Sequence, residues 1–213
     1  MYQKTVIEAA VEDFRRSVEI TRDVRFQANL RLAKRQRLSS YVVSFLSLYV
    51  ISLSLLPNII SLDPTKSQIL LACSIILSVF IIFTSLIDGA QNFHHQGELL
   101  HLCARKLAKV HQDLKKLDVN VDPTKAGDIL GELQAQYRKA LDECPINHDN
   151  VDFVRQKAVK PHLFPRDYAR SFKIPLMLWY RIYAKIACYS WLFTHVIAVT
   201  TISIVVYVFV FKA

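Results

Sequence analysis

The chain has 213 residues, of which 52% are hydrophobic and 21% are charged, and its formal net charge is +9. With only 4 glycines and 7 prolines, the composition disfavours an all-β fold. In a soluble protein, a net charge of this size would indicate a nucleic-acid partner. Here the basic residues flank long apolar runs, so a membrane surface explains them better and direct nucleic-acid binding is not expected.

Residues 4–37 are predicted to form a helix that precedes the first apolar run. Its apolar residues Ile7, Val11, Phe14 and Val18 recur at helical spacing and lie on one face. The end of this segment is basic and has no acidic residue after Asp23, which favours a cytoplasmic position.

Two membrane spans are predicted next, over residues 38–62 and 67–87. Neither range contains a charged residue, and each is long enough to cross about 30 Å of hydrocarbon at about 1.5 Å per residue. The connection between them is short, so the two spans should form an antiparallel hairpin.

Residues 88–165 are predicted to contain a cytoplasmic pair of helices. Apolar residues alternately three and four apart predict a packing seam on the first helix: Leu100, Cys103, Leu107, Val110, Leu114 and Leu117. The second helix has one apolar face: Leu130, Leu133, Tyr137 and Leu141.

A third uncharged run, residues 186–211, is predicted to be a C-terminal transmembrane helix. Residues 88–187 hold sixteen Lys and Arg, whereas the connection 57–66 holds one. The positive-inside rule then predicts a cytoplasmic N-terminus and a C-terminus on the outer face. The expected fold class is an all-α membrane protein with an N-terminal cytoplasmic helix, a transmembrane hairpin, a cytoplasmic helical pair and a third C-terminal transmembrane helix.

Serines recur at helical spacing in the first two spans. They are Ser40, Ser44, Ser47 and Ser54 in the first span, and Ser67, Ser74, Ser78 and Ser85 in the second. Small polar residues in lipid belong at helix contacts or along a water path. These serines are therefore candidates either for a packing seam between the spans or for a pore-lining face in an oligomer.

Two ionisable residues lie at or within the predicted spans. Asp88 ends the second span, either as an interfacial residue without a partner or as a gating residue. His195 lies inside the third span, where an ionisable group is a functional hypothesis by default. The alternatives for His195 are a neutral imidazole hydrogen-bonded between helices and a protonation site that changes the packing.

No enzyme is predicted. The sequence contains no P-loop, GxGxxG, GxSxG or HExxH motif, and its four cysteines lack zinc spacing. His94, His95, His101 and His111 could be considered metal ligands, but no carboxylate completes a set with them. We expect no catalytic residue, no metal and no cofactor.

Three stretches, in this order, resemble the SLATT domains, which are two-span effectors of bacterial conflict systems. The first is RQRLSSYVVSFLSLYVISLSLLP, with the family-like span pattern at Leu46–Pro57. The second is LIDGAQNFHHQGELLHLCARKLAKVHQDLKKL, with Gly89 and Phe93. The third is YRKALDECPINHDNVDF, with an Asn147-His148 pair before Asp152-Phe153.

The resemblance covers about residues 5–185. It predicts a SLATT-like domain over 1–185, followed by a separate third span over 186–211. The third span is a departure from the two-span pattern and resembles a subfamily associated with reverse transcriptases.

The resemblance implies a non-enzymatic effector that oligomerises and permeabilises the bacterial inner membrane as an abortive-infection defence against phage. It also implies a regulatory partner encoded nearby, either a nucleotide second-messenger synthase or a reverse transcriptase. The alternative is a membrane-anchored interaction or scaffold protein whose basic cytoplasmic helices bind a partner.

Asn147, His148 and Asp152 also have an interpretation from the residues themselves. Asn147 could cap the following helix, and His148 and Asp152, four apart, could pair on its surface. They are therefore either cap and fold residues, or a contact with the trigger or with a neighbouring subunit.

Overall fold

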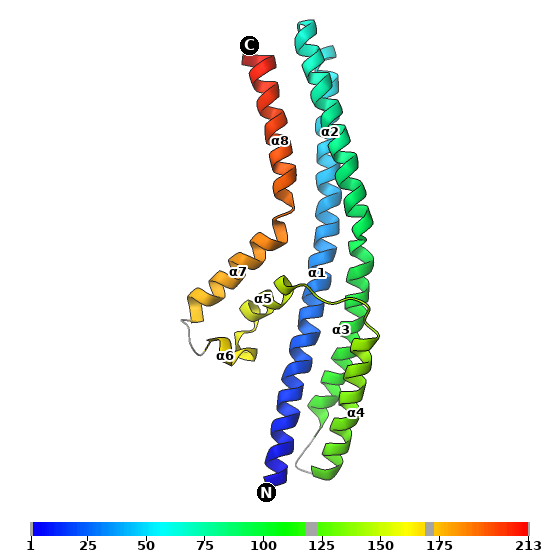
Figure 1. Ribbon diagram of the computed structural model, residues 1–213, viewed down its shortest axis with the longest axis vertical. Coiled ribbons are helices and arrows are strands. Elements are labelled where there is room, and N and C mark those ends of the chain that lie inside the picture. The colour runs from blue at the N-terminus through cyan, green and yellow to red at the C-terminus, as the bar shows by residue number, and fades with distance from the viewer. Residues whose placement is uncertain (1, 118–122, 169–172, 213) are drawn as a thin grey trace. The chain divides into compact units, whose positions relative to one another are not determined.

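The computed structural model describes residues 2–117, 123–168 and 173–212, and the regular structure in these ranges is entirely helical (Figure 1). Within these ranges, three helical stretches are long and apolar enough to cross a membrane: Val6–Ile59, Pro64–Lys116 and Leu192–Lys212. The predicted fold class is therefore confirmed.

The chain divides into two compact units. The polar unit comprises Met1–Leu32 and His94–Ala187, and the apolar unit comprises Ala33–Phe93 and Cys188–Ala213. Helix α1, Tyr2–Ile59, contributes residues to both, because no glycine or proline interrupts it before Pro57 in its last turn.

The apolar unit contains the second half of α1, helix α2 (Pro64–Gln91), helix α8 (Leu192–Val206) and the π-helical turn η2 (Tyr207–Lys212). Its packed centre consists of Leu53, Leu70, Cys73, Val206 and Val210. At most 22% of the most apolar part of each spanning helix is buried within the chain. Most of their apolar side chains therefore need an apolar solvent outside the chain.

The ends of α2 have clear local causes. Asp63 is the N-cap, its carboxylate accepts a hydrogen bond from the Thr65 backbone N–H at 3.1 Å, and Pro64 occupies the first turn. The helix ends at Gln91 because Asn92 adopts the left-handed conformation, with φ of 47°, which Asn tolerates better than most residues.

The third span differs in extent from the prediction. Residues 186–189 belong to α7, a turn follows at Ser190 and Trp191, and α8 begins at Leu192. From Leu192 to Lys212 the helix has 21 residues, which is still about 30 Å at 1.5 Å per residue.

In the polar unit, three helices share a core. They are the first half of α1, α3 (Phe93–Lys116) and α4 (Pro123–Asp142). Five of the six predicted seam residues of α3 are buried, and the core joins Val18 of α1, Val110 of α3 and Leu130 of α4. The ring of Phe14 lies edge-on to that of Tyr137, with centroids 5.4 Å apart.

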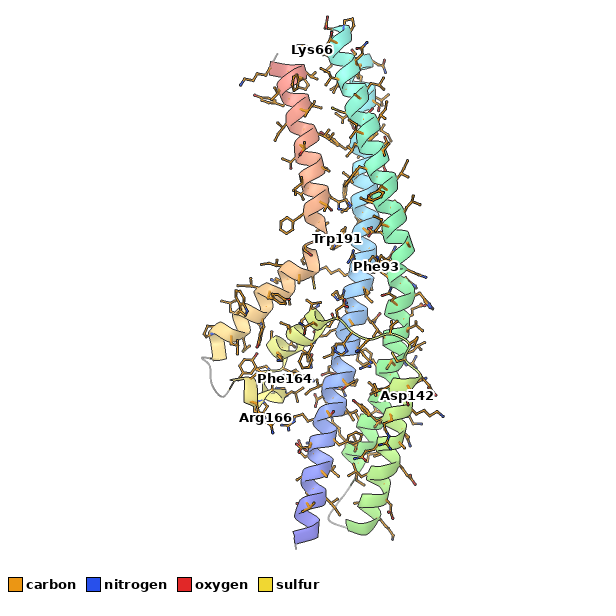
Figure 2. All side chains as sticks on the ribbon, viewed as in Figure 1. Lys66, Phe93, Asp142, Phe164, Arg166 and Trp191 are labelled. Carbon is orange, nitrogen blue, oxygen red and sulfur yellow. The ribbon has the colours of Figure 1, made fainter. Side chains whose placement is uncertain are left out.

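The rest of the polar unit is built from short elements. These are α5 (Asn150–Val159), η1 (Pro161–Leu163), α6 (Pro165–Tyr168) and α7 (Lys173–Tyr189). They pack around Leu163, Phe164 and Tyr168, with Phe164 labelled in Figure 2. Ile20 of α1 contributes to the same cluster.

Candidate functional site

A polar and aromatic cluster lies in the apolar unit near the end of α2, where the long uncharged run of that helix stops. Asp88, near the end of α2, accepts a hydrogen bond from the Ser39 hydroxyl of α1. Its other carboxylate oxygen lies 3.9 Å from a terminal nitrogen of Arg35, one turn before Ser39. Ser39 is buried and the Asp88 side chain is 14% exposed. The carboxylate is therefore held between two groups of α1, which joins the two helices of the hairpin.

The Arg35 guanidinium extends this cluster to α8 through aromatic rings. Its central carbon lies 4.2 Å from the ring centroid of Phe93 and 5.6 Å from that of Trp191. Both rings are labelled in Figure 2, one just after the break that ends α2 and the other just before α8. Cation–π contacts of this kind are each worth about 0.5–2 kcal/mol. We call Arg35, Ser39, Asp88, Phe93 and Trp191 the Asp88 cluster.

His195 adjoins the Asp88 cluster. It is buried one turn into α8, with its ring edge-on to Trp191 at 5.5 Å and to Phe80 of α2 at 5.6 Å. Its Nδ1 lies 3.3 Å from the Trp191 carbonyl oxygen. Asp88 and His195 were predicted separately, and the structure connects them through Arg35 and Trp191.

A second polar cluster lies in the polar unit at the start of α5. Asp149 is the N-cap, and its backbone N–H donates to Asp152 at 3.2 Å. Arg31 of α1 pairs with both, at 2.8 Å to Asp152 and 2.6 Å to Asp149. The Asp152 side chain is 1% exposed, so a buried charge is compensated by a bidentate guanidinium.

The predicted roles of Asn147 and His148 require correction. The cap of α5 is Asp149, whereas the Asn147 amide oxygen accepts from the backbone N–H of His148 at 2.9 Å. Asp152 pairs with Arg31 of α1 instead of pairing with His148 on the helix surface, because Asp152 points inward. His148 is half-buried, and burial together with the charge of Arg25 lowers the pKa of its imidazole.

A network around Lys160 connects α5 to α1. The Lys160 ammonium lies 2.6 Å from Glu19 and 2.7 Å from Asp23, and Gln156 donates to Asp23 at 3.1 Å. Burial alone would raise the pKa of both carboxyls. The hydrogen bonds and charge of Lys160, with help from Arg22, outweigh it and lower the pKa of Glu19 and of Asp23.

The family model for the SMODS and SLOG-associating 2TM effector domain, family 5 (SLATT family 5), matches residues 7–210. The chain belongs to the SLATT family. It is a membrane effector of that family, and the resemblance identified from the sequence is confirmed. No curated protein and no solved structure matches the chain. The family description names two spans, and the matched range also includes α8.

The serines of this SLATT chain are placed differently in its two hairpin helices. In α1, Ser40, Ser44 and Ser54 are exposed and Ser47 is half-buried. In α2, Ser74 is buried, Ser67 and Ser78 are half-buried, and Ser85 is exposed. Six of the eight serines donate to a carbonyl of their own helix: Ser40, Ser44, Ser47, Ser54, Ser74 and Ser78.

Three of the four histidines that were considered as metal ligands in the SLATT chain have separate partners, and the fourth, His95, is exposed. His94 is exposed beside Glu98, and His101 lies edge-on to Phe26. His111 is buried, with its Nδ1 2.7 Å from an Arg22 nitrogen. Within residues 2–117, 123–168 and 173–212, no three His, Cys, Asp or Glu side chains gather as a metal site would require.

Sequence reasoning missed the residues that connect the helices. Arg35 was noted only as a basic flank, Ser39 was not among the singled-out serines, and Lys160 was not considered. A signal existed for the last network, because Glu19 and Asp23 are four apart on one helix face. Nothing in the sequence indicated which cation of a distant segment would meet them.

Proposed function

We propose that this SLATT protein oligomerises in the bacterial inner membrane and permeabilises it, without enzymatic chemistry, as an abortive-infection defence against phage. The N-terminus would be cytoplasmic and the C-terminus on the outer face. A nucleotide-based or reverse-transcriptase-based sensor encoded nearby would supply the trigger.

The observation that carries the proposal is the exposed serine face of α1. Ser40, Ser44 and Ser54 lie on the surface of the apolar unit, among lipid-facing side chains such as Phe45 and Leu48. Their hydroxyls donate to their own helix, so lipid exposure leaves no donor unsatisfied. Small polar residues of this kind are typical of contacts between membrane helices.

A second copy of the chain is the partner that this face fits. One hairpin encloses no channel, so conduction requires several hairpins side by side. The same serines could then contact each other between subunits or line a water path, and the oxygen of each hydroxyl remains able to accept a further hydrogen bond.

The Asp88 cluster supports a gating role at one end of such an assembly. Asp88 holds α1 against α2, and Arg35 contacts the ring of Trp191, which directly precedes α8. Changing one side chain of this cluster would therefore loosen three helices together. We infer that the closed state keeps these contacts and that the open state gives some of them up.

Liposome dye release tests the proposal, with a matched pair of α1 variants. Ser44→Leu alters the serine face. Ser52→Leu changes another exposed serine of α1 that donates to its own helix but lies off that face. The parent chain should release dye in a concentration-dependent way, either alone or together with the partner that is encoded nearby. Of the two variants, only Ser44→Leu should reduce the release. A chain that stays monomeric in lipid and releases no dye under any of these conditions contradicts the proposal.

The scaffold alternative has less support in the polar unit. Several of its basic side chains are already paired with acids of the same unit: Arg15, Arg16, Arg22, Arg31, Lys106, Lys157 and Lys160. This pairing reduces the positive charge available to an outside partner. Toxicity that survives both serine variants unchanged would favour the scaffold.

A further inference from the structure

Helix α7 has two apolar faces, of which the chain covers one. The inner face, with Leu176, Met177 and Tyr180, packs on the cluster around Phe164. The outward face is exposed, and its members are Leu178 (56% exposed), Trp179 (62%), Ile182 (43%), Tyr183 (44%) and Ile186 (59%). These positions are spaced four apart in two adjoining rows, so they form one stripe along the helix.

An exposed stripe of two aromatic and three large aliphatic side chains indicates a missing partner. Single exposed apolar residues are ordinary, but a contiguous patch marks an interaction surface. The stripe is bordered by two exposed cations, Arg181 and Lys185. A partner must therefore offer both an apolar layer and negative charge.

The chain's own connectivity identifies that partner. Helix α7 ends at Tyr189 and α8, a membrane-spanning helix, begins at Leu192. Three residues cover at most about 10 Å even when fully extended. The headgroup layer on each side of a bilayer is about 5–8 Å thick, so the end of α7 must lie at or next to it.

The residue types of the stripe fit that layer. Tryptophan and tyrosine are enriched at headgroup depth, where the ring is apolar and its N–H or O–H stays wet. Long basic side chains at the edge of such a face reach the phosphates while their stems cover apolar surface.

We propose that the outward face of α7 binds an anionic phospholipid leaflet, with the stripe at the headgroup–acyl boundary and with Arg181 and Lys185 on lipid phosphates. This inference requires that α8 spans the bilayer, and it does not require that the chain forms a pore.

Fluorescence quenching of Trp179 tests the inference in the full chain. The chain has two tryptophans, so Trp191→Phe, which keeps an aromatic ring beside Arg35, leaves Trp179 as the only tryptophan, and excitation selective for tryptophan avoids the tyrosines. The protein is reconstituted in phosphatidylcholine vesicles with and without phosphatidylglycerol. Lipids brominated near the carbonyl end of the acyl chain should quench Trp179 strongly, and acrylamide in the water should quench it weakly.

The charge contribution is tested by Arg181→Gln with Lys185→Gln. Phosphatidylglycerol should increase the quenching by brominated lipid in the parent and much less in this variant. Each basic residue near an anionic surface changes the bound-to-free ratio by about fivefold. Equal quenching of the parent in both vesicle types would overturn the anionic preference.

A matched apolar pair tests the stripe itself. Ile182 and Ile129 of α4 are both 43% exposed. Ile182→Ser should weaken lipid quenching of Trp179, whereas Ile129→Ser should leave it unchanged, with circular dichroism confirming that both variants keep the parent's helicity. Equal quenching in the two variants overturns the assignment of this face.

Two further outcomes would also overturn the proposal. Trp179 that escapes brominated lipid but is quenched by acrylamide faces water. Trp179 that escapes both quenchers is covered by protein, as it would be in a contact with a second copy of the chain.

Discussion

Ile129 in α4 and Ile76 in α2 are both exposed isoleucines on helices, but their surroundings are opposite. Ile129 lies between the charged residues Asp128 and Glu132, in the polar unit. Ile76 lies among other exposed apolar residues of the apolar unit, including Leu71, Ile75 and Val79. The helix geometry is the same, and the polarity of the outer surface is reversed. The comparison teaches that the two units are built for two solvents, water and lipid.

The polar contacts differ in the same way. The polar unit uses ion pairs between distant segments, such as Arg31 with Asp152 and Lys160 with Asp23. In the apolar unit, helix contacts such as Tyr49 with Ser203 are neutral, and the ion pair between Arg35 and Asp88 lies at one end of α2. These ion pairs therefore lie outside the long uncharged runs, as expected if lipid surrounds those runs.

The largest expected effect is in the polar unit, at Asp152. Asp152→Ala leaves Arg31, which is only 12% exposed, without its buried carboxylate. We expect a loss of about 3 kcal/mol in the unfolding free energy of this unit, because the buried bidentate pair is broken and the exposed carboxylate of Asp149 replaces it poorly. Hydrogen exchange of α5 and of the first half of α1, in detergent micelles, measures the change.

Asp149 provides the control for Asp152. It also pairs with Arg31 but is 67% exposed. Asp149→Asn should lower stability by about 0–1 kcal/mol, because exposed ion pairs contribute little and Asn still caps the helix. Equal losses in the two variants would mean that burial of the charge is not what matters.

The next largest effect is expected when the same charge is placed on the outer surface of the apolar unit and of the polar unit. Ile76→Lys places a charge near the middle of α2 and should cost about 2.5–3.5 kcal/mol in membrane insertion. Ile129→Lys makes the same substitution in α4 and should be almost neutral, since water solvates the ammonium. The fraction of each variant that is recovered in carbonate-washed membranes measures its insertion. A similar loss in both variants would contradict the claim that lipid surrounds α2 and water surrounds α4.

A smaller effect is expected at the junction of the apolar unit. Asp88→Ala removes the acceptor of the Ser39 hydroxyl and the counter-charge of Arg35. The expected loss is about 1.5–3 kcal/mol, as for a hydrogen bond to a charged group. Thermal unfolding in micelles measures it, and dye release should increase if this cluster holds the closed state. Asp88→Ala with unchanged stability and unchanged release would leave the cluster without a role.

The smallest expected effect is a loss of stability of the polar unit at acid pH. The folded protein lowers the pKa of Asp23 and Glu19, so their contribution is present above the unfolded values, near pH 4. It is lost as pH falls through the lowered values. The loss of stability should shrink in Lys160→Gln and persist in Lys160→Arg. Denaturation measured between neutral pH and pH 3 tests this. An acid loss that is unchanged in Lys160→Gln would assign it to other carboxyls.

The sequence predicted the parts of this fold that depend on periodicity or on long uncharged runs. The seam of α3 and the apolar runs are such features, since helix geometry and bilayer thickness set their patterns directly. The exact position of the break, at Asn92, was not predicted, because asparagine only permits a left-handed turn and does not require one. The turn at Ser190 and Trp191, which moves the start of α8 to Leu192, had no proline or glycine to mark it.

The candidate sites were predictable one residue at a time, but their partners were not. Asp88 and His195 were selected because ionisable groups at a span are costly. The cations that compensate the acids, Arg35 for Asp88 and Arg31 for Asp152, come from α1, 53 and 121 positions away. Local spacing carries no information about such pairs.

Collision accessibility of spin labels at Ile76 and Ile129 tests the central claim most directly. In reconstituted vesicles, a label at Ile76 should collide with dissolved oxygen far more than with a water-soluble nickel complex, because oxygen concentrates in hydrocarbon. A label at Ile129 should show the reverse. If the label at Ile76 were as accessible to nickel as the label at Ile129, or shielded from both reagents, lipid would not be the solvent of α2.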